Sequence, residues 1–69
     1  MIEQIKYQYS IANDHKVIRL CNEFLNQTNN NNNFEALNYK AQSHKNLLQD
    51  REAINTYQKI VNYLSLIHI

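Results

Sequence analysis

The sequence predicts an all-α fold made of tandem antiparallel helix hairpins, and three observations favour it. Gly and Pro are both absent from the 69 residues, so tight turns and sheet bulges lack their usual residues. Apolar residues recur at steps of three and four along four segments, and no segment alternates as a strand would. The second half of the chain also matches the first at a spacing of 36 residues.

The first two helices are expected near residues 1–12 and 14–28. Asn13 and Asp14 lie between their apolar stripes, and both side chains can accept hydrogen bonds from the free amides that open a helix. The apolar residues of the first helix form a narrow stripe, whereas those of the second helix form a wider one. The stripe residues are Ile2, Ile5, Tyr9 and Ala12 in the first helix, and Val17, Ile18, Leu20, Cys21, Phe24 and Leu25 in the second.

The third and fourth helices are expected near residues 34–48 and 50–64, with Asn33 and Asp50 as their capping residues. The preceding run "TNNNNN" (residues 28–33) predicts a loop, because Asn adopts the left-handed backbone conformations that Gly normally supplies. An aggregation-prone tract is the alternative interpretation of this run. The stripe residues are Phe34, Leu37, Ala41, His44 and Leu48, and then Ala53, Ile54, Tyr57, Ile60, Val61 and Leu64.

A shift of 36 residues aligns the two halves of the chain. Asp14 then falls on Asp50, and small or apolar positions coincide along the whole of the second and fourth helices. The first and third helices agree more weakly. The match predicts two helix–turn–helix units in tandem. The aligned pairs are Val17 with Ala53, Ile18 with Ile54, Cys21 with Tyr57, Phe24 with Ile60, Leu25 with Val61, Asn26 with Asn62, Ile5 with Ala41, Ile11 with Leu47, and Ala12 with Leu48.

The segment "EAINTYQKIV" (residues 52–61) combines a small Ala53 with an aromatic Tyr57 one turn later. Together with Leu37 and Ala41, it makes residues 34 to about 65 similar to a tetratricopeptide repeat, a pair of antiparallel helices. In that family, small residues stand where helices approach closely, and the aromatic residue fills the space toward the next helix. The departures are Lys40, His44, Leu48 and Ile60, which replace the usual Leu, aromatic residue, Gly and Ala, and no Pro occurs near residue 65.

The resemblance implies a division of the chain into four parts. Residues 1–28 form a partial first repeat, 29–33 the Asn-rich loop, 34–63 the second repeat, and 64–69 a tail for which the repeat has no need. The tail "LSLIHI" is also the translation of CTG TCT CTT ATA CAC ATC, a transposon-end adapter used in sequencing libraries. We therefore expect a non-native tail and a chain that is a fragment of a longer repeat protein, in which Met1 is an internal methionine. The alternative is a natural hydrophobic tail that continues the fourth helix. Codons that differ from the adapter at positions 64–69 would contradict the non-native origin.

Composition and charge argue against several classes of protein. The net charge is +1, and the sparse basic residues Lys16, Arg19, Lys40 and Lys45 are expected on solvated faces, which does not favour nucleic-acid binding. No apolar run approaches the roughly 20 residues of a membrane span, and the polar N-terminus does not resemble a signal peptide. Cys21 is the single cysteine, which fits a reducing, cytoplasmic location.

Catalytic, cofactor and metal sites find no support, so we expect a protein that is not an enzyme. No glycine-rich loop exists, and no carboxylate pair is set among apolar residues. His15, His44 and His68 lack metal-ligand spacing with one another and with Cys21. His44 and Cys21 lie on the packing stripes and are expected in the core.

The resemblance implies protein–protein interaction or scaffolding, with a peptide or helix bound on the concave face. In tetratricopeptide arrays this face is lined by the first helix of each hairpin. Amides can donate and accept hydrogen bonds, and Tyr offers contact area with little loss of entropy. No dense cationic cluster is present for the carboxylate-clamp mode. The candidate residues are Glu3, Lys6, Tyr9, Asn38, Tyr39, Gln42, Lys45 and Asn46, with Ile2 and Ser10 beside them.

Two further expectations concern the chain as a whole. The alternative function is a sensor segment of a larger signalling or transcription-regulatory protein, which neighbouring coding sequence would reveal. Repeat arrays generally need about three repeats for stability, and this chain has fewer than two complete ones. We therefore expect weak helicity or self-association through the exposed faces of the terminal helices.

Overall fold

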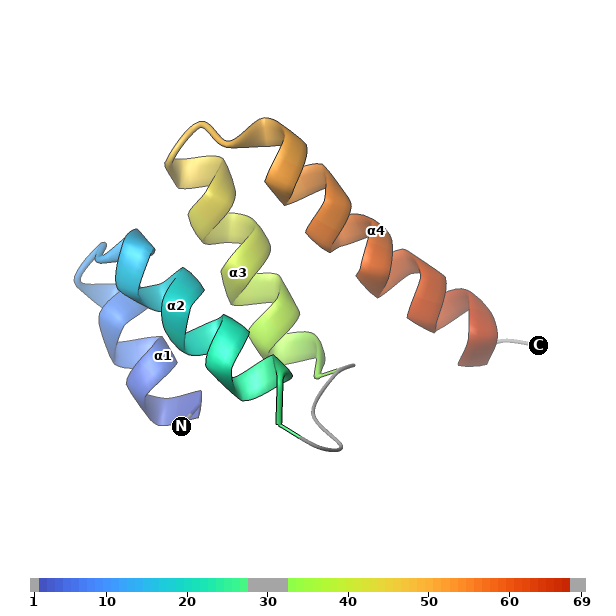
Figure 1. Ribbon diagram of the computed structural model, residues 1–69, viewed down its shortest axis with the longest axis horizontal. Helices are drawn as coiled ribbons and strands as arrows, with labels where there is room; N and C mark the ends of the chain where they lie inside the picture. Colours follow the sequence, from blue (N-terminus) through green and yellow to red (C-terminus); the bar gives the residue numbers. More distant parts are fainter. Residues whose placement is uncertain (1, 28–32, 68–69) are drawn as a thin grey trace.

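Four helices form two consecutive antiparallel hairpins (Figure 1). The structure, a computed structural model, describes residues 2–27 and 33–67, and the side chains of residues 2–27 and 33–62. The first hairpin contains α1 (Ile2–Ser10) and α2 (Asp14–Leu25), and the second contains α3 (Phe34–Asn46) and α4 (Asp50–Ile67). No strand occurs in these ranges, so the predicted all-α class is confirmed.

The helix boundaries differ from expectation at all four C-terminal ends. The helices α2 and α3 end at Leu25 and Asn46, three and two residues before the expected positions 28 and 48. The helix α1 stops at Ser10, two residues early, and α4 continues to Ile67, three residues beyond the expected end near 64. Residues 64–67 of the tail therefore belong to α4, whereas residues 68 and 69 lie outside the described residues. Residues 29–32 of the expected Asn-rich loop also lie outside them.

The two hairpin turns have the same backbone conformation at positions 36 residues apart. Ala12 and Leu48 both adopt the left-handed region, with φ of 60° and 61°. The amide of Asn13 donates to the carbonyl of Gln8 at 2.9 Å, and the amide of Gln49 donates to the carbonyl of His44 at 2.8 Å. These bonds close the C-terminal end of the preceding helix in each hairpin. The 36-residue period of the sequence is thus also a period of the backbone.

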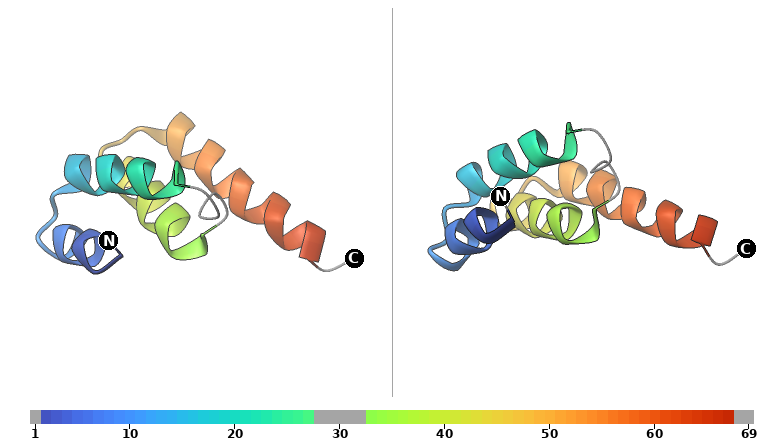
Figure 2. Two further views of the ribbon diagram at one scale, coloured as in Figure 1. Left: turned by 60° about the horizontal axis from the view of Figure 1, so that its bottom comes forward. Right: turned by 90° about the horizontal axis from the view of Figure 1, so that it is seen from below.

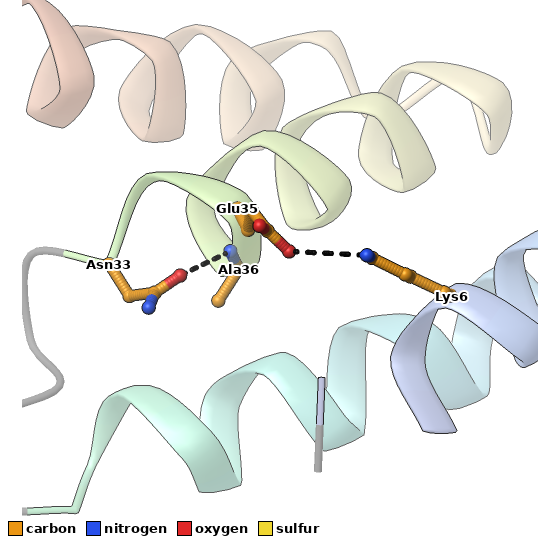
Figure 3. Close-up of polar contacts among 4 residues, drawn as sticks. All are labelled: Lys6, Asn33, Glu35 and Ala36. Carbon is orange, nitrogen blue, oxygen red and sulfur yellow. Dashed lines mark hydrogen bonds and ion pairs between the residues drawn. The ribbon is translucent and has the colours of Figure 1, made fainter. Parts of the chain in front are cut away.

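The helix starts agree with the predicted capping residues only in part. The Asn33 side chain accepts a hydrogen bond from the Ala36 amide at 3.0 Å, which confirms it as the cap of α3 (Figure 3). The prediction for Asn13 was wrong, because its side chain makes no cap hydrogen bond. The side-chain Nδ2 of Asn13 instead donates to Gln8 Oε1 at 3.1 Å. Asp50 is the first residue of α4 rather than its cap, so its charge acts on the helix dipole.

The core lies where the two hairpins meet. Ile5 of α1, Val17, Leu20 and Cys21 of α2, and Ala36 of α3 form one buried cluster. Consistent with this cluster, α3 contacts α1, α2 and α4, and Figure 2 shows α1 and α3 on the same side of the molecule. Within the described residues, α4 contacts only α3. The last helix is therefore held from one side.

The second hairpin packs through small residues, as the sequence predicted. Ala41 and Ala53 are both buried, and they lie in the helices α3 and α4, which contact one another. Short side chains at these positions allow two helix axes to approach closely. Cys21 and His44 are also buried, which confirms the expectation that both are core residues.

Candidate partner-binding surface

A hydrogen-bonded cluster of predicted binding residues joins α1 to α3. The Tyr9 hydroxyl donates to Gln42 Oε1 at 2.5 Å, and Gln42 Nε2 donates to Asn38 Oδ1 at 3.0 Å. The rings of Tyr9 and Tyr39 meet edge to face with centroids 5.1 Å apart, a favourable arrangement for aromatic pairs. Tyr9 lies at least 29 positions before Asn38, Tyr39 and Gln42 in the sequence, and these four candidate residues therefore form one contiguous patch.

An ion pair extends this patch toward the start of α3. Lys6 Nζ lies 3.8 Å from Glu35 Oε2, and both side chains are more than half exposed (Figure 3). An exposed pair of this kind stabilises a fold by about 0–1 kcal/mol. Lys6 was a predicted site residue, but Glu35 was not. No sequence pattern indicates Glu35, because its pairing with Lys6 depends on how the two hairpins are placed.

The other candidate residues take different positions. Glu3 and Lys45 are exposed on α1 and α3. Asn46 donates from Nδ2 to Asp14 Oδ1 at 3.2 Å, so it links the end of α3 to the start of α2. The Ser10 hydroxyl donates to the carbonyl of Tyr7 at 2.6 Å, and Ile2 packs against the core. Three of the candidates are half-buried, namely Tyr9, Tyr39 and Gln42. They hold α1 against α3 and expose little surface to a partner.

A pocket of about 430 Å³ opens beside Asn38, between the first part of α3 and the middle of α4. Its apolar lining residues had been assigned to packing stripes and not to a site. They remain accessible because, in the described part of the chain, no helix follows α4 as α3 follows α2. The lining residues are Phe34, Glu35, Asn38, Tyr57 and Ile60.

Lys40 does not lie on a solvated face, which corrects the prediction for this residue. It is half-buried, and burial lowers the pKa of its ammonium group, with Lys59 adding to the decrease. Cys21 and Glu52 act in the opposite direction on this pKa. Burial also raises the pKa of the Cys21 thiol to about 11, although the charge of Lys40 opposes the change. Lys40 therefore lies beside the core of the first hairpin.

The other basic and titratable groups of the described residues form no hydrogen-bonded patch like that of Tyr9, Gln42 and Asn38. His15, Lys16 and Arg19 line a shallow hollow of about 290 Å³ with Asn13 at the start of α2. In residues 2–27 and 33–62, no group of three or more His, Cys, Asp and Glu side chains is placed to hold a metal ion. The described helices also include none with the length and apolar character that crossing a membrane requires.

Comparisons with protein-family models, with curated proteins and with solved structures found no match to this chain. The class of the molecule is therefore defined by its own architecture. It is an all-α protein of two hairpins, in which the turns and the starts of α2 and α4 recur after 36 residues.

Proposed function

We propose that this chain is a tetratricopeptide-type repeat segment that acts in protein–protein interaction or scaffolding and has no enzymatic activity. The proposal assigns the binding of a peptide or helix to the face formed by α1 and α3. The main support is the patch of Tyr9, Gln42, Asn38 and Tyr39, which fixes the first helices of both hairpins side by side. A face fixed before binding loses less entropy when a partner docks.

The chemistry of this face suits a polypeptide partner. Asn38 retains one donating amide group beside Gln42, and Lys45 lies exposed further along the same helix. An amide can bond the backbone of an extended peptide, and an ammonium group can bond a carbonyl or a carboxylate. Glu3 and Lys6 offer charges of both signs on α1. These groups favour a peptide of mixed polarity over a nucleic acid, whose phosphates require a continuous cationic surface.

Selection from a phage-displayed random peptide library tests the proposal with a defined probe. Peptides enriched on the wild-type chain are synthesised and titrated by calorimetry against the variant Asn38→Ala/Lys45→Ala. The loss of two hydrogen bonds, at about 1 kcal/mol each, is expected to weaken binding by tenfold or more, as about 1.4 kcal/mol corresponds to a factor of ten.

The matched control is Asn22→Ala/Lys16→Ala, which removes the same residue types from exposed positions on α2. This control is expected to bind the selected peptides as the wild type does. A library that yields no binding peptide would contradict the proposed function. Peptides that bind the Asn38/Lys45 variant with unchanged affinity would contradict the assignment of the face.

We also propose a cytoplasmic location, which the free, buried Cys21 supports, since unpaired thiols are typical of reducing compartments. The competing proposal, a sensor segment of a larger signalling or transcription-regulatory protein, uses the same face. The two differ in whether a catalytic or DNA-binding region is encoded nearby. Sequencing the flanking genomic region distinguishes them.

A further inference from the structure

Large apolar side chains are exposed on the two outermost helices of the described chain. Tyr7 and Ile11, on α1 and just after it, are more than half exposed, as are Ile54 and Val61 on α4. Tyr57, also on α4, is 37% exposed. Single exposed apolar residues are normal on a protein surface, but groups that share a helix face mark contact sites. The repeat period shows what kind of contact each group is suited to make.

The exposed face of α4 corresponds to a covered face of α2. Each of its three apolar residues stands 36 positions after a residue of α2 that is buried or half-buried. The helix α2 contacts α1 and α3, whereas within the described residues α4 contacts only α3. The face of α4 thus lacks the helix that would stand where α3 stands on α2. The pairs are Ile18 with Ile54, Cys21 with Tyr57, and Leu25 with Val61.

The pocket beside α4 has a filled counterpart in the first hairpin. Its residues Asn38, Tyr57 and Ile60 stand 36 positions after Ile2, Cys21 and Phe24. Those three residues belong to the core around Ala36 of α3, where Ile2 and Phe24 pack against the buried cluster. The pocket of about 430 Å³ is therefore open at the position that α3 fills against the first hairpin.

The exposed face of α1 corresponds, after 36 residues, to the face of α3 that packs against α2. On α3, the residues Ala36, Lys40 and Ser43 share one face by helical spacing, and Ala36 packs into the cluster with α2. Ser43 is fully buried, and Leu47 continues this face as a half-buried residue. The positions 36 residues before Ser43 and Leu47 are Tyr7 and Ile11, which are both exposed.

We propose that a second copy of this chain covers each of these faces. The Tyr7–Ile11 face of one copy docks on the Ile54–Tyr57–Val61 face of another copy. The contact repeats, between molecules, the α2–α3 interface that exists within one molecule. Because the two docking faces differ, the association is head to tail and leaves one free face at each end. Growth therefore continues beyond the dimer. The apolar residues of these two faces are not among those of the peptide-binding face proposed above, although Asn38 of that face also lines the pocket beside α4.

Sedimentation velocity over a concentration series tests the association. The wild-type chain is expected to show a weight-average mass that rises past the dimer between about 1 µM and about 1 mM, a range that covers moderate affinities. Two variants each block one face with charge, namely Tyr7→Lys/Ile11→Lys and Ile54→Lys/Val61→Lys. Each variant alone is expected to remain monomeric. A wild-type chain that is monomeric throughout the series would overturn the proposal.

Mixing the two variants distinguishes head-to-tail from symmetric contact. One variant retains an intact α4 face and the other an intact α1 face, so an equimolar mixture is expected to form a 1:1 dimer and nothing larger. Symmetric pairing of α4 with α4 would let the Tyr7/Ile11 variant dimerise alone, which would overturn the proposal. If a variant alone loses its circular dichroism at 222 nm, mixing is expected to restore it. Absence of recovery would count against head-to-tail docking.

The control is Leu48→Lys/Asn22→Lys, which adds the same two charges outside both faces. It also replaces one exposed apolar side chain, since Leu48 is largely exposed. The control is expected to associate as the wild type does. Association lost equally in this control would indicate general charge repulsion and would overturn the assignment of the two faces.

Discussion

At the scale of single residues, Lys40 is a charged residue whose burial lowers the free energy of unfolding. Burial lowers the pKa of its ammonium group, so the charged form is disfavoured in the folded state, and Lys59 adds repulsion. We expect Lys40→Met to raise the free energy of unfolding at pH 7 by about 1 kcal/mol, because Met keeps the apolar stem and removes the half-buried charge. Urea denaturation of both proteins measures the difference.

The pH dependence of this effect has a definite sign. A group whose pKa is lower in the folded state binds more protons when unfolded, so its contribution to stability rises with pH. The rise occurs between the lowered pKa of folded Lys40 and its ordinary value of 10.5. The advantage of Lys40→Met should therefore shrink as the pH approaches 10.5. An advantage that grows with pH would contradict this explanation.

Cys21 should react slowly in the folded protein. Its side chain is buried, and burial raises the pKa of the thiol from 9.0 to about 11. Only the thiolate attacks a disulfide reagent, so two pKa units reduce the reactive fraction at pH 8 about a hundredfold. We expect labelling of native protein by 5,5′-dithiobis(2-nitrobenzoate) to be at least about a hundredfold slower than in denaturant. Equal rates would show that Cys21 is accessible.

At the scale of elements, the turn between α3 and α4 contains a strained residue. Leu48 adopts a left-handed conformation with φ of 61°, which costs a residue with a Cβ about 1–2 kcal/mol. Its side chain is 84% exposed, so Leu48→Gly removes little packing. After the greater freedom of Gly in the unfolded chain is subtracted, about 0.5–1 kcal/mol, we expect a net gain of about 0.5–1 kcal/mol.

Equilibrium denaturation measures this gain, and the equivalent turn supplies a parallel test. Ala12 has φ of 60°, so Ala12→Gly should raise the free energy of unfolding in the same direction. Leu47→Gly is the contrasting variant, since Leu47 has φ of −89° and should lose stability when replaced. Loss of stability in Leu48→Gly would contradict the strain argument.

The sequence predicted the helices and several of their packing residues, because these follow from local periodicity. Other residues of the predicted stripes are exposed, namely Leu48, Ile54 and Val61. Ala41, Ala53 and Cys21 were placed correctly in the core, since each lies on an apolar stripe with helical spacing. Sequence reasoning failed where a position depends on how helices meet. Lys40 was placed in solvent, because its burial and its electrostatic interaction with Cys21 of α2 arise only when the second hairpin is set against the first.

The candidate site was predicted to a similar extent. The resemblance to tetratricopeptide repeats selected residues on α1 and α3, and several of them do meet, as in the bond from Tyr9 to Gln42. It did not indicate that Tyr9 and Gln42 would bond each other and so become half-buried. It also missed the pocket beside Tyr57, which is accessible because α4 contacts only α3 within the described residues.

At the scale of the whole molecule, the folded state is expected to depend on protein concentration. In the described chain α4 is held by α3 alone, and repeat arrays gain stability from each additional neighbour. Association that covers α1 and α4 should therefore stabilise the fold by mass action. We expect the melting temperature, followed by circular dichroism, to rise with protein concentration. A sharp melt of a monomer at one temperature for all concentrations would contradict this expectation.

The two hairpins share one core through the contact of α3 with α2. Methyl–methyl nuclear Overhauser effects in solution test it most directly, because Ala36 belongs to the buried cluster with Val17 and Leu20. We expect effects between the Ala36 methyl group and the methyl groups of both residues. A spectrum in which Ala36 shows effects only to its own hairpin would mean two independent hairpins, and would contradict the account.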